Sequence, residues 1–323
     1  MRRNPDYCKR PVLFLLIFLL AAGAAGIFFT THYADTLLDS IHFVDASPTL
    51  PQPDVVSTAG TSLSSEPEAL SGSVNILLIG QDRSEESYRT RSDTILLCTF
   101  HPKSKTLTMT SILRDLYVTI PGHGNNRINA AYTAGGIPLL RQTLEENFGI
   151  TVDGCVEVDF SGFAEIIDLL GGVELELRQE EADIINKSTG SSLSAGKQLL
   201  GGRQALAYAR IRKLDADGDF SRTARQRKLL SVLLETCRHS SLPTLLRLVK
   251  EALPLITTDI PRKELSSLVL ELLPMISQLE IREQYIPAEG TYSYQTIRGM
   301  SVLVADMEAA RQLLQSTLSG SDG

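Results

Sequence analysis

The stretch that decides the fold is CVEVDFSGFAEIIDLLGGVELEL, residues 155–177. Its first part, CVEVDF, predicts a short strand, and SGFAEIIDLLGG predicts a helix. We expect Ser161 to cap the start of this helix, and Gly171 and Gly172 to end it. The final VELEL alternates acidic and apolar residues, which predicts a second strand. A strand, a helix and a strand in this order indicate an α/β fold.

The neighbouring segments continue the alternation of strands and helices. Residues 74–80, VNILLIG, form an apolar run that ends at a glycine and suits a strand buried on both faces. Residues 92–100 and 106–113 predict two further strands, and residues 135–149 have helical spacing and end at a glycine. Helical stretches follow residue 230, and a final helix is predicted at residues 305–318. We therefore expect an α/β sheet with helices packed on it.

The N-terminal residues predict a membrane anchor. Residues 12–29 carry no charged or strongly polar side chain, and about 18 such residues are near the lower limit for a membrane-spanning helix. The basic side chains within residues 1–11 make these residues a cytoplasmic tail and place everything after residue 30 outside. The alternative is a signal peptide cleaved near the small residues 21–26, which leaves the rest of the chain outside as well.

Composition separates a linker from the folded part of the chain. Residues 30–73 are expected to be a membrane-proximal segment and a flexible linker, because residues 46–73 are rich in Pro, Ser, Thr and Gly without an apolar period. We expect the folded core to span residues 74–235. Residues 236–323 would complete the same domain with helical and strand elements.

Charge and cysteine content restrict the classes of function. A formal net charge of -7 and a pI near 5.4 argue against bulk binding of nucleic acid. Three of the four cysteines follow the N-terminal apolar run, an odd number without metal-like spacing, so we expect no disulfide framework. The sequence contains no Walker A motif, no G-x-S-x-G motif and no evident histidine dyad. Any binding of polyanions therefore requires a local basic patch.

Residues 205–230 concentrate positive charge in this acidic chain. The segment holds five arginines: Arg210, Arg212, Arg222, Arg225 and Arg227. Arg210 and Arg212 share a face if their segment is extended. Guanidinium groups bind phosphate oxygens through two parallel hydrogen bonds, so several arginines together suit a diphosphate. A solvated basic face is the alternative explanation of the same charge.

The second half of this basic segment is predicted to be a helix. Either Asp219 or Ser221 could begin it, which would direct the amide dipoles of its first turn toward an anion. Arg222, Arg225 and Gln226 have the spacing of residues on one helical face.

Polar residues also stand at the ends of three predicted strands. Asp82 follows the first strand, Asp93 stands at the start of the second, and Arg114 and Asp115 close the third. Such groups commonly line a ligand crevice in an α/β sheet, although turn and capping roles are the alternative. Paired aspartates suit Mg²⁺ bound together with phosphates of a substrate. Phosphoryl transfer needs mainly positioning and neutralisation of charge, so it requires no nucleophilic side chain.

Seven ordered motifs occur in a pattern known from one family. They are NILLIGQDR, RSDTILL, SILRDLYVTIPG, RINAAYTAGG, VEVDFSGFAEIIDLLGGVELEL, LSAGKQLLGGRQALAYARIR and GDFSRTARQRKLL. The chain resembles the LytR–CpsA–Psr family of cell-wall ligases, strongly over residues 74–234 and more weakly over YIPAEGTYSYQTIRGMSVLVADMEAA. The resemblance implies a catalytic core at residues 74–235, with three α/β/α layers and a central mixed sheet, outside the cytoplasm.

The resemblance also implies an activity and its partners. Members of the family transfer a glycopolymer, with its phosphate, from a polyprenyl-pyrophosphate carrier to peptidoglycan, assisted by Mg²⁺. This implies a single-pass membrane protein of a Gram-positive-type envelope. The predicted position of the basic segment outside the cell argues against binding of nucleic acid. The polymer could be a teichoic acid, a capsule, an arabinogalactan-like chain or a protein-linked glycan. A lipid-pyrophosphate hydrolase and a non-catalytic receptor for anionic wall polymers are the alternatives.

The functional residues of the family carry over by matching motifs. Asp82 and Asp93 match the aspartates linked to the metal, and Asp93 is also a candidate general base. The implied catalytic residues are Arg114, Arg210, Arg212 and Asp93. The implied pyrophosphate-binding residues are Arg114, Arg127, Arg210, Arg212, Arg222, Arg225 and Gln226. The chain departs from the usual motif at Arg127, where the family has lysine, and at Leu113, where proline is more common.

The apolar residues between sheet and helices have two interpretations, a binding site for the lipid chain or an ordinary core. The predicted helix FAEIIDLLGG and the apolar strands could enclose a hydrophobic tunnel between sheet and helices. Ordinary core packing would use the same residues.

Overall fold

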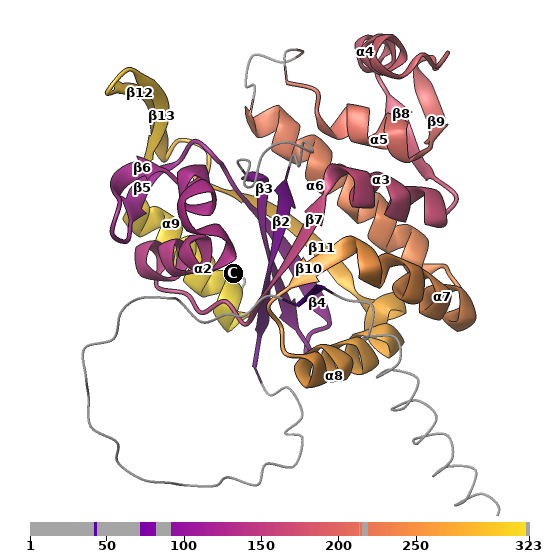
Figure 1. The fold of residues 1–323 in the computed structure, drawn as a ribbon, viewed down its shortest axis with the longest axis horizontal. Coiled ribbons are helices and arrows are strands. Elements are labelled where there is room, and N and C mark those ends of the chain that lie inside the picture. Colours follow the sequence, from indigo (N-terminus) through magenta and orange to yellow (C-terminus); the bar gives the residue numbers. More distant parts are fainter. Residues whose placement is uncertain (1–41, 44–71, 82–91, 213, 215–218, 321–323) are drawn as a thin grey trace, which may run out of the picture.

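A computed structural model describes residues 42–43, 72–81, 92–212, 214 and 219–320. The anchor predicted at residues 12–29 lies outside these ranges, as does nearly all of the linker predicted at residues 30–73. Within the described ranges, no helix is both long enough and apolar enough to cross a bilayer. Helices cover both faces of a central sheet (Figure 1).

The central sheet has seven strands. They are β1 (His42–Phe43), β2 (Val74–Gln81), β3 (Ser92–His101), β4 (Thr106–Ile112), β7 (Gly154–Asp159), β10 (Ile256–Thr258) and β11 (Glu280–Ile286). Their order is β1-β10-β7-β2-β3-β4-β11. Strand β3 lies antiparallel between β2 and β4, whereas β2 pairs in parallel with β7, and β4 with β11. The mixed central sheet implied by the resemblance is therefore confirmed.

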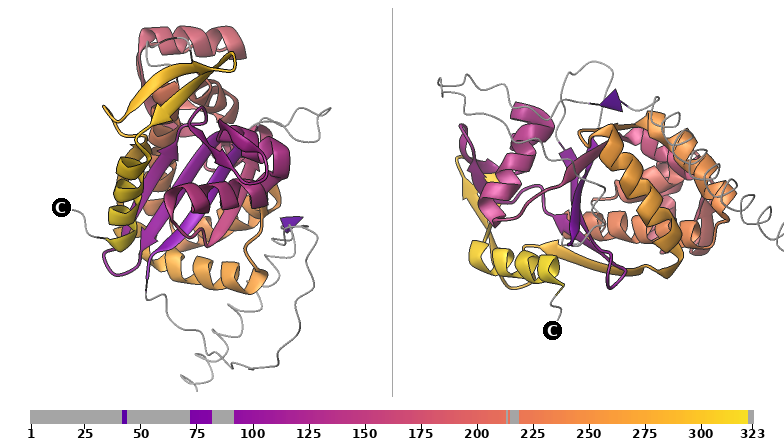
Figure 2. Two further views of the ribbon diagram at one scale, coloured as in Figure 1. Left: turned by 90° about the vertical axis from the view of Figure 1, so that its left-hand side faces the viewer. Right: turned by 90° about the horizontal axis from the view of Figure 1, so that it is seen from below.

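Helices form a layer on each side of this sheet (Figures 1 and 2). On one side lie α2 (Asn129–Phe148) and α9 (Met307–Ser319). On the other side lie α3 (Phe160–Leu169), α5 (Gly202–Ala209), α6 (Asp219–Arg238), α7 (Leu242–Ala252) and α8 (Arg262–Leu272). Two short 3-10 helices, η2 (Leu253–Leu255) and η3 (Leu273–Gln278), follow α7 and α8.

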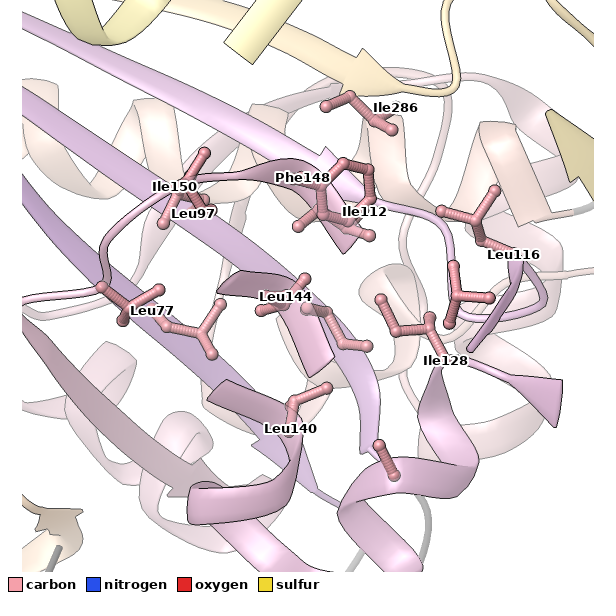
Figure 3. Close-up of a cluster of buried hydrophobic side chains, with 14 of the residues drawn as sticks. Leu77, Leu97, Ile112, Leu116, Ile128, Leu140, Leu144, Phe148, Ile150 and Ile286 are labelled. Carbon is pink, nitrogen blue, oxygen red and sulfur yellow. The ribbon is translucent and has the colours of Figure 1, made fainter. Parts of the chain in front are cut away.

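Alternation of side chains along β2 explains why its consecutive central residues are apolar. Leu77 is fully buried toward α2, where it joins Leu140 and Leu144 in the main hydrophobic core (Figure 3). Burial of one such leucine contributes about 1.5–3 kcal/mol to folding. The next residue, Leu78, points to the opposite face and lines a pocket there. Both faces of the strand are thus covered, as predicted for residues 74–80.

Helix α2 starts earlier than the sequence indicates. It begins at Asn129 and contains a kink at Gly136, whose φ of 67° and ψ of -152° are not helical. The predicted segment at residues 135–149 corresponds to the part around and after this kink. The predicted end is confirmed, because Gly149 adopts the left-handed conformation with φ of 66°.

Helix α3 is capped by Asp159, not by Ser161 as predicted. The Gly162 backbone N–H donates a hydrogen bond of 2.8 Å to Asp159 Oδ1. The carboxylate at the end of β7 therefore reaches the first turn before Ser161 can, and Ser161 lies inside the helix. The predicted end is confirmed, since Gly171 and Gly172 follow with φ values of 84° and 98°.

A small lobe extends beyond the main sheet. Strand β8 (Val173–Leu177) is present as predicted, but it pairs with β9 (Gly196–Leu200) in a separate two-stranded sheet. Helix α4 (Gln179–Thr189) packs here together with α5 and α6, around buried residues that include Leu175, Ile185 and Leu229. The N-terminal half of α6 is thereby held between this lobe and the main sheet.

The end of the chain packs against the loop that follows β4. Beyond β11, the strands β12 (Tyr292–Ile297) and β13 (Met300–Ala305) form an antiparallel hairpin. The Leu303 backbone N–H donates to the Asp115 carbonyl oxygen at 2.9 Å. A second hairpin, β5 (Tyr117–Ile120) and β6 (Gly124–Arg127), continues from the same loop. Arg114 therefore lies where segments from distant parts of the sequence meet.

Candidate functional site

Asp219, the first residue of α6, lies between two arginines. Its Oδ1 is 2.5 Å from Nη2 of Arg222, one helical turn later, and 3.4 Å from Nε of Arg114. The side chain of Arg222 is 1% exposed and that of Asp219 is 14% exposed. A cation this deeply buried requires a paired anion, because an unpaired buried charge costs several kcal/mol. Asp219 therefore fixes Arg222 at the N-terminus of α6.

Asp115 extends this group of charges toward the β5–β6 hairpin. Its Oδ2 is 3.7 Å from Nε of Arg114, and its Oδ1 accepts a hydrogen bond of 3.2 Å from Nη1 of Arg127. Arg127 ends β6, which pairs with β5. The resulting series Arg127, Asp115, Arg114, Asp219 and Arg222, here called the arginine cluster, alternates positive and negative side chains. Three arginines predicted from the sequence to bind pyrophosphate are thus brought together.

Backbone hydrogen bonds hold the loop that carries Arg114. The Leu113 backbone N–H donates to the Ile286 carbonyl oxygen at 3.0 Å, and the Asn129 N–H donates to the Arg114 carbonyl oxygen at 3.2 Å. Leu113 is 1% exposed, so its side chain packs in the interior. Proline, which is more common here in the family, has no N–H for the first bond. Leucine at position 113 thus adds a backbone hydrogen bond between the loop and β11.

The electrostatic environment of Asp219 contains opposing effects. Burial is the largest of them and raises the pKa of its carboxyl above the ordinary value of 3.8. The cations of Arg222, Arg114 and Arg212 lower this pKa, whereas the carboxylate of Asp115 raises it. The net direction is upward. Because Arg212 acts on Asp219, this further predicted arginine lies within electrostatic range of the arginine cluster.

Arg210 is the C-cap of α5, with helical φ of -95° and ψ of -2°, and Arg212 follows it outside the helix. Both side chains are exposed, whereas Ile211 between them is buried. The helical backbone at Arg210 contradicts the extended alternative for this residue, although both arginine side chains lie on the solvent side of Ile211. The guanidinium carbon of Arg210 lies 4.7 Å from the centroid of the Phe160 ring, at the start of α3.

An apolar pocket lies between the sheet and helices α3, α5 and α6. Its volume is about 610 Å³, including the part open to solvent. Most of the side chains that line the pocket are apolar. They are Leu78, Ile79, Leu96, Val158, Phe160, Phe163, Leu206, Ala209 and Leu230. Gly80, Thr94, Arg210 and Gln226 complete the lining. Gln226 is one helical turn from Arg222, so the pocket adjoins the arginine cluster. A hollow of this composition suits a hydrocarbon chain attached to a charged group.

Arg225 points away from the arginine cluster, toward the small lobe. Its Nε donates to Oε1 of Glu181 at 2.9 Å, and its Nη1 donates to the Ile211 carbonyl oxygen at 3.3 Å. Burial alone would raise the pKa of Glu181, but hydrogen bonds from Arg225 and Arg178 lower it below its ordinary value. These contacts attach α6 to α4 and give Arg225 a structural role.

The side chains predicted to bind magnesium lie outside the description of the structure. Asp82 falls in the segment 82–91, and Asp93 is described in its backbone alone. Gln81 pairs with Ser92, and the register shifts between Gly80 and Gln81. The residues that precede the two aspartates in the chain are thus neighbours in the sheet.

A buried polar network lies beneath this end of the sheet. Gln81 donates to Glu157, and the Tyr132 hydroxyl donates to Glu157 as well as to Gln81. All three side chains are buried. Among the side chains that are described, no group of three or more His, Cys, Asp and Glu residues could hold a metal ion. We therefore predict no magnesium ligands besides Asp82 and Asp93.

Two acidic members of the cluster were not assigned a site role from the sequence. The sequence predicts Asp219 only as a start of α6, and Asp115 only as a polar residue at a strand end. The sequence does contain a signal for Asp219, because its spacing of three residues from Arg222 places both on one helical face. No local pattern predicts that Arg114 would reach the same carboxylate.

The fold and the site together define a class of protein. It is a three-layer α/β domain in which an arginine cluster at the end of the sheet adjoins an apolar pocket, an arrangement suited to an anionic group on an apolar chain. The profile of the LytR_cpsA_psr family matches residues 53–317. The chain belongs to this family.

Characterised relatives match about half of the chain. The regulatory protein MsrR of Staphylococcus aureus (strain COL) is 38% identical over 164 residues, which cover 50% of this chain and 48% of MsrR. The polyisoprenyl-teichoic acid--peptidoglycan teichoic acid transferase TagT of Bacillus subtilis (strain 168) is 39% identical over 179 residues, 53% of this chain and 55% of TagT. The chain thus matches about half the length of these curated relatives.

Solved structures match over a larger part of the chain. The structure of TagT bound to LIIa-WTA is similar with a TM-score of 0.65 and 30% identity, covering 79% of this chain and 94% of that one. The structure of YwtF (TagT) with bound octaprenyl pyrophosphate lipid has a TM-score of 0.60 and 28% identity, with 79% and 94% coverage.

Proposed function

We propose that the chain is a membrane-anchored phosphotransferase of the cell envelope. It would transfer a glycopolymer, with its phosphate, from a polyprenyl-pyrophosphate carrier to peptidoglycan. The observation that carries this proposal is the position of the arginine cluster beside the apolar pocket, because the two together match a charged diphosphate on a hydrocarbon chain. The printed names of TagT and TagV, which are teichoic acid transferases, support the same reaction class.

The arginines supply the charge that this reaction needs. Arg114 and Arg222 enter the site from different segments, and Arg210 and Arg212 lie at its exposed side. Their guanidinium groups would bind the diphosphate oxygens and stabilise the charge that develops on them in the transition state. Asp219 and Asp115 hold Arg114, so this arginine is oriented before the substrate binds.

The transfer balances as a single displacement at phosphorus. The hydroxyl oxygen of the acceptor forms a bond to the phosphorus that bears the glycan. The bond from this phosphorus to the bridging oxygen breaks, and polyprenyl phosphate leaves with the electron pair. The proton of the acceptor hydroxyl passes to a base, for which Asp93 is the candidate, or to water. The glycan thus becomes linked to the acceptor through a phosphodiester.

Magnesium is part of the proposal. Asp82 and Asp93 would hold the ion, consistent with the pairing of Gln81 and Ser92 directly before them. When bound, Mg²⁺ neutralises phosphate oxygens of the substrate. Residues 12–29 would anchor the protein in the membrane and leave the site outside the cytoplasm.

A transfer assay with the full-length chain tests the function. The donor is a polyprenyl-pyrophosphate-linked glycan, and the readouts are release of polyprenyl phosphate and incorporation of glycan into peptidoglycan. We expect Arg114→Ala and Arg210→Ala each to reduce transfer about 100-fold or more while the protein stays folded. Arg247→Ala, which changes an exposed arginine of α7, serves as the control with unchanged transfer.

The same assay separates the alternatives. Release of polyprenyl phosphate that is equally fast without peptidoglycan and yields free glycan phosphate would show a hydrolase. Binding of anionic polymers that weakens with salt, without Mg²⁺ dependence and without release of polyprenyl phosphate, would show a receptor. Full activity of a folded Arg114→Ala variant would contradict the role of the arginine cluster.

A further inference from the structure

Aromatic rings connect the N-terminus of α6 with the C-terminal hairpin. The Phe220 ring stacks on the Tyr292 ring with a centroid distance of 4.8 Å and an interplanar angle of 25°. Tyr292 in turn meets Tyr294 edge to face at 6.0 Å. Tyr285 of β11 supports Phe220 from the side at 5.4 Å. Phe220, Tyr292 and Tyr294, here called the aromatic row, thus extend from α6 along β12.

One end of the aromatic row adjoins the arginine cluster. Phe220 directly follows Asp219 in the chain and lies two residues before Arg222, so its ring begins where the charged groups end. The loop that carries Asp115 is bonded to the same hairpin through the Leu303 N–H. The row and the cluster are therefore parts of one continuous surface.

The other end of the row is open to solvent. Tyr294 is 59% exposed, and it is the one aromatic residue among the large hydrophobic residues that are exposed in the described part of the chain. Packing of the hairpin against α6 accounts for Phe220, Tyr285 and Tyr292, which are partly buried, but it does not account for Tyr294. Exposed tyrosines offer a rigid ring with a polar tip, and this is typical of surfaces that bind ligands.

The chemistry of the row suits a saccharide chain. The face of an aromatic ring is electron-rich, and the axial C–H groups of a pyranose ring carry partial positive charge, so the two stack. A row of rings allows successive sugar units to stack while their hydroxyl groups stay hydrated.

The geometry of the reaction indicates which saccharide the aromatic row would bind. In phosphoryl transfer, the attacking and leaving oxygens lie roughly in line on opposite sides of the phosphorus. The leaving group is the lipid phosphate, and its apolar pocket lies over β7, β2 and β3. In the strand order, β4 and its Arg114 loop come next, followed by β11 with Tyr285. The aromatic row therefore lies across the arginine cluster from the lipid pocket, on the side from which an acceptor attacks.

We propose that the aromatic row of Phe220, Tyr292 and Tyr294 binds the glycan strand of the peptidoglycan acceptor. This inference rests on the proposed function, because the direction of attack follows from the leaving lipid phosphate. Tyr294 contributes the outer stacking contact, and the row guides a sugar hydroxyl toward the arginine cluster.

Steady-state transfer with the full-length chain provides one test. The acceptor is a soluble, uncrosslinked peptidoglycan glycan fragment, and its concentration is varied at saturating donor. We expect Tyr294→Ala to raise the acceptor KM about 3- to 10-fold, the size of one stacking contact, with an unchanged donor KM. Tyr294→Phe, which keeps the ring, should retain the wild-type KM. Gln295→Ala, which changes the next residue on the opposite face of β12, is the matched control.

Equilibrium binding of the same glycan fragment, measured without donor, provides a second test that does not need catalysis. We expect the Kd to rise about 3- to 10-fold in Tyr294→Ala and to stay unchanged in the two control variants. An unchanged Kd and acceptor KM in Tyr294→Ala would overturn the proposal, and so would a rise confined to the donor KM, which would assign the row to the donor glycan. If the wild-type chain transfers nothing, the proposed function fails, and this binding experiment still decides whether the row binds glycan.

Discussion

Arg222 and Asp219 form a buried ion pair across one turn of α6, with 2.5 Å between Nη2 and Oδ1. The same oxygen of Asp219 is 3.4 Å from Nε of Arg114, which comes from the loop after β4. One carboxylate therefore positions two guanidinium groups from separate segments. This arrangement links the stability of the α6 N-terminus to the geometry of the candidate site.

Removal of the Arg222 cation should destabilise the protein. Arg222→Met keeps an apolar stem of similar length but leaves Asp219 buried with one cation fewer. We expect the free energy of unfolding to fall by about 3 kcal/mol at neutral pH, because breaking a buried ion pair leaves an uncompensated charge. Urea denaturation measures this change.

The matched control for Arg222 lies on the same helix. Arg238 and Glu235 form a pair with the same spacing, but their side chains are 31% and 47% exposed. Arg238→Met should therefore change the free energy of unfolding by less than about 1 kcal/mol. Equal losses in the two variants would show that burial of Arg222 has no special energetic role.

The raised pKa of Asp219 gives a second prediction, on pH dependence. Because burial raises this pKa above 3.8, the folded protein binds the Asp219 proton more tightly than the unfolded chain does. The contribution of this carboxyl to stability is complete below pH 3.8 and is lost as the pH rises through the raised pKa. Asp219→Asn has no carboxyl that titrates at this position. The free energy of unfolding of this variant, minus that of the wild type, should therefore increase with pH in this window.

Urea denaturation of both proteins across the acidic range measures the difference. A relative stability of Asp219→Asn that falls with pH would contradict the raised pKa. At neutral pH the same variant should lose most of its transfer activity, because Arg114 and Arg222 no longer share an anion.

The two neighbouring arginines of α6 differ in what the sequence can reveal. Arg222 and Arg225 have the same spacing signal, yet Arg222 joins the arginine cluster and Arg225 binds Glu181 of α4. Helical periodicity places both arginines on one side of α6, but only tertiary packing determines which neighbour each side chain meets. The sequence therefore predicted the basic helix and could not separate its two roles.

The same distinction between local and long-range signals applies to the fold. Apolar runs and glycine stops predicted β2, β3, β4 and the ends of α2 and α3, because these features depend on nearby residues. The parallel pairing of β11 with β4 and the stacking of Phe220 on Tyr292 join segments far apart in the chain. No periodicity within either segment encodes such a contact.

A third prediction tests the structural role of Arg225. Arg225→Met breaks the buried pair with Glu181, so we expect a loss of about 3 kcal/mol in the free energy of unfolding. In the folded Arg225→Met variant, the donor KM should change less than about 2-fold, because the Arg225 side chain points away from the arginine cluster. A donor KM that rises about 10-fold or more at unchanged stability would instead support the pyrophosphate-binding role predicted from the sequence.

The last prediction concerns the apolar pocket. Val158 of β7 lines this pocket and is only partly buried, so a larger side chain at this position extends into the hollow. We expect Val158→Phe to raise the donor KM about 10-fold for a long polyprenyl chain and much less for a short one, because only the long chain needs the filled space. Transfer assays with donors of two chain lengths measure this.

A variant two residues earlier controls for overpacking in the Val158 experiment. Val156 lies on the same strand and packs against the separate apolar cluster of Leu253, Ile260 and Leu265. Val156→Phe adds the same volume away from the pocket, so it should lower stability by about 1–3 kcal/mol without a preference for short donors. If both variants raise the donor KM equally for long and short chains, the pocket does not hold the lipid, because a steric block inside a lipid site must depend on chain length.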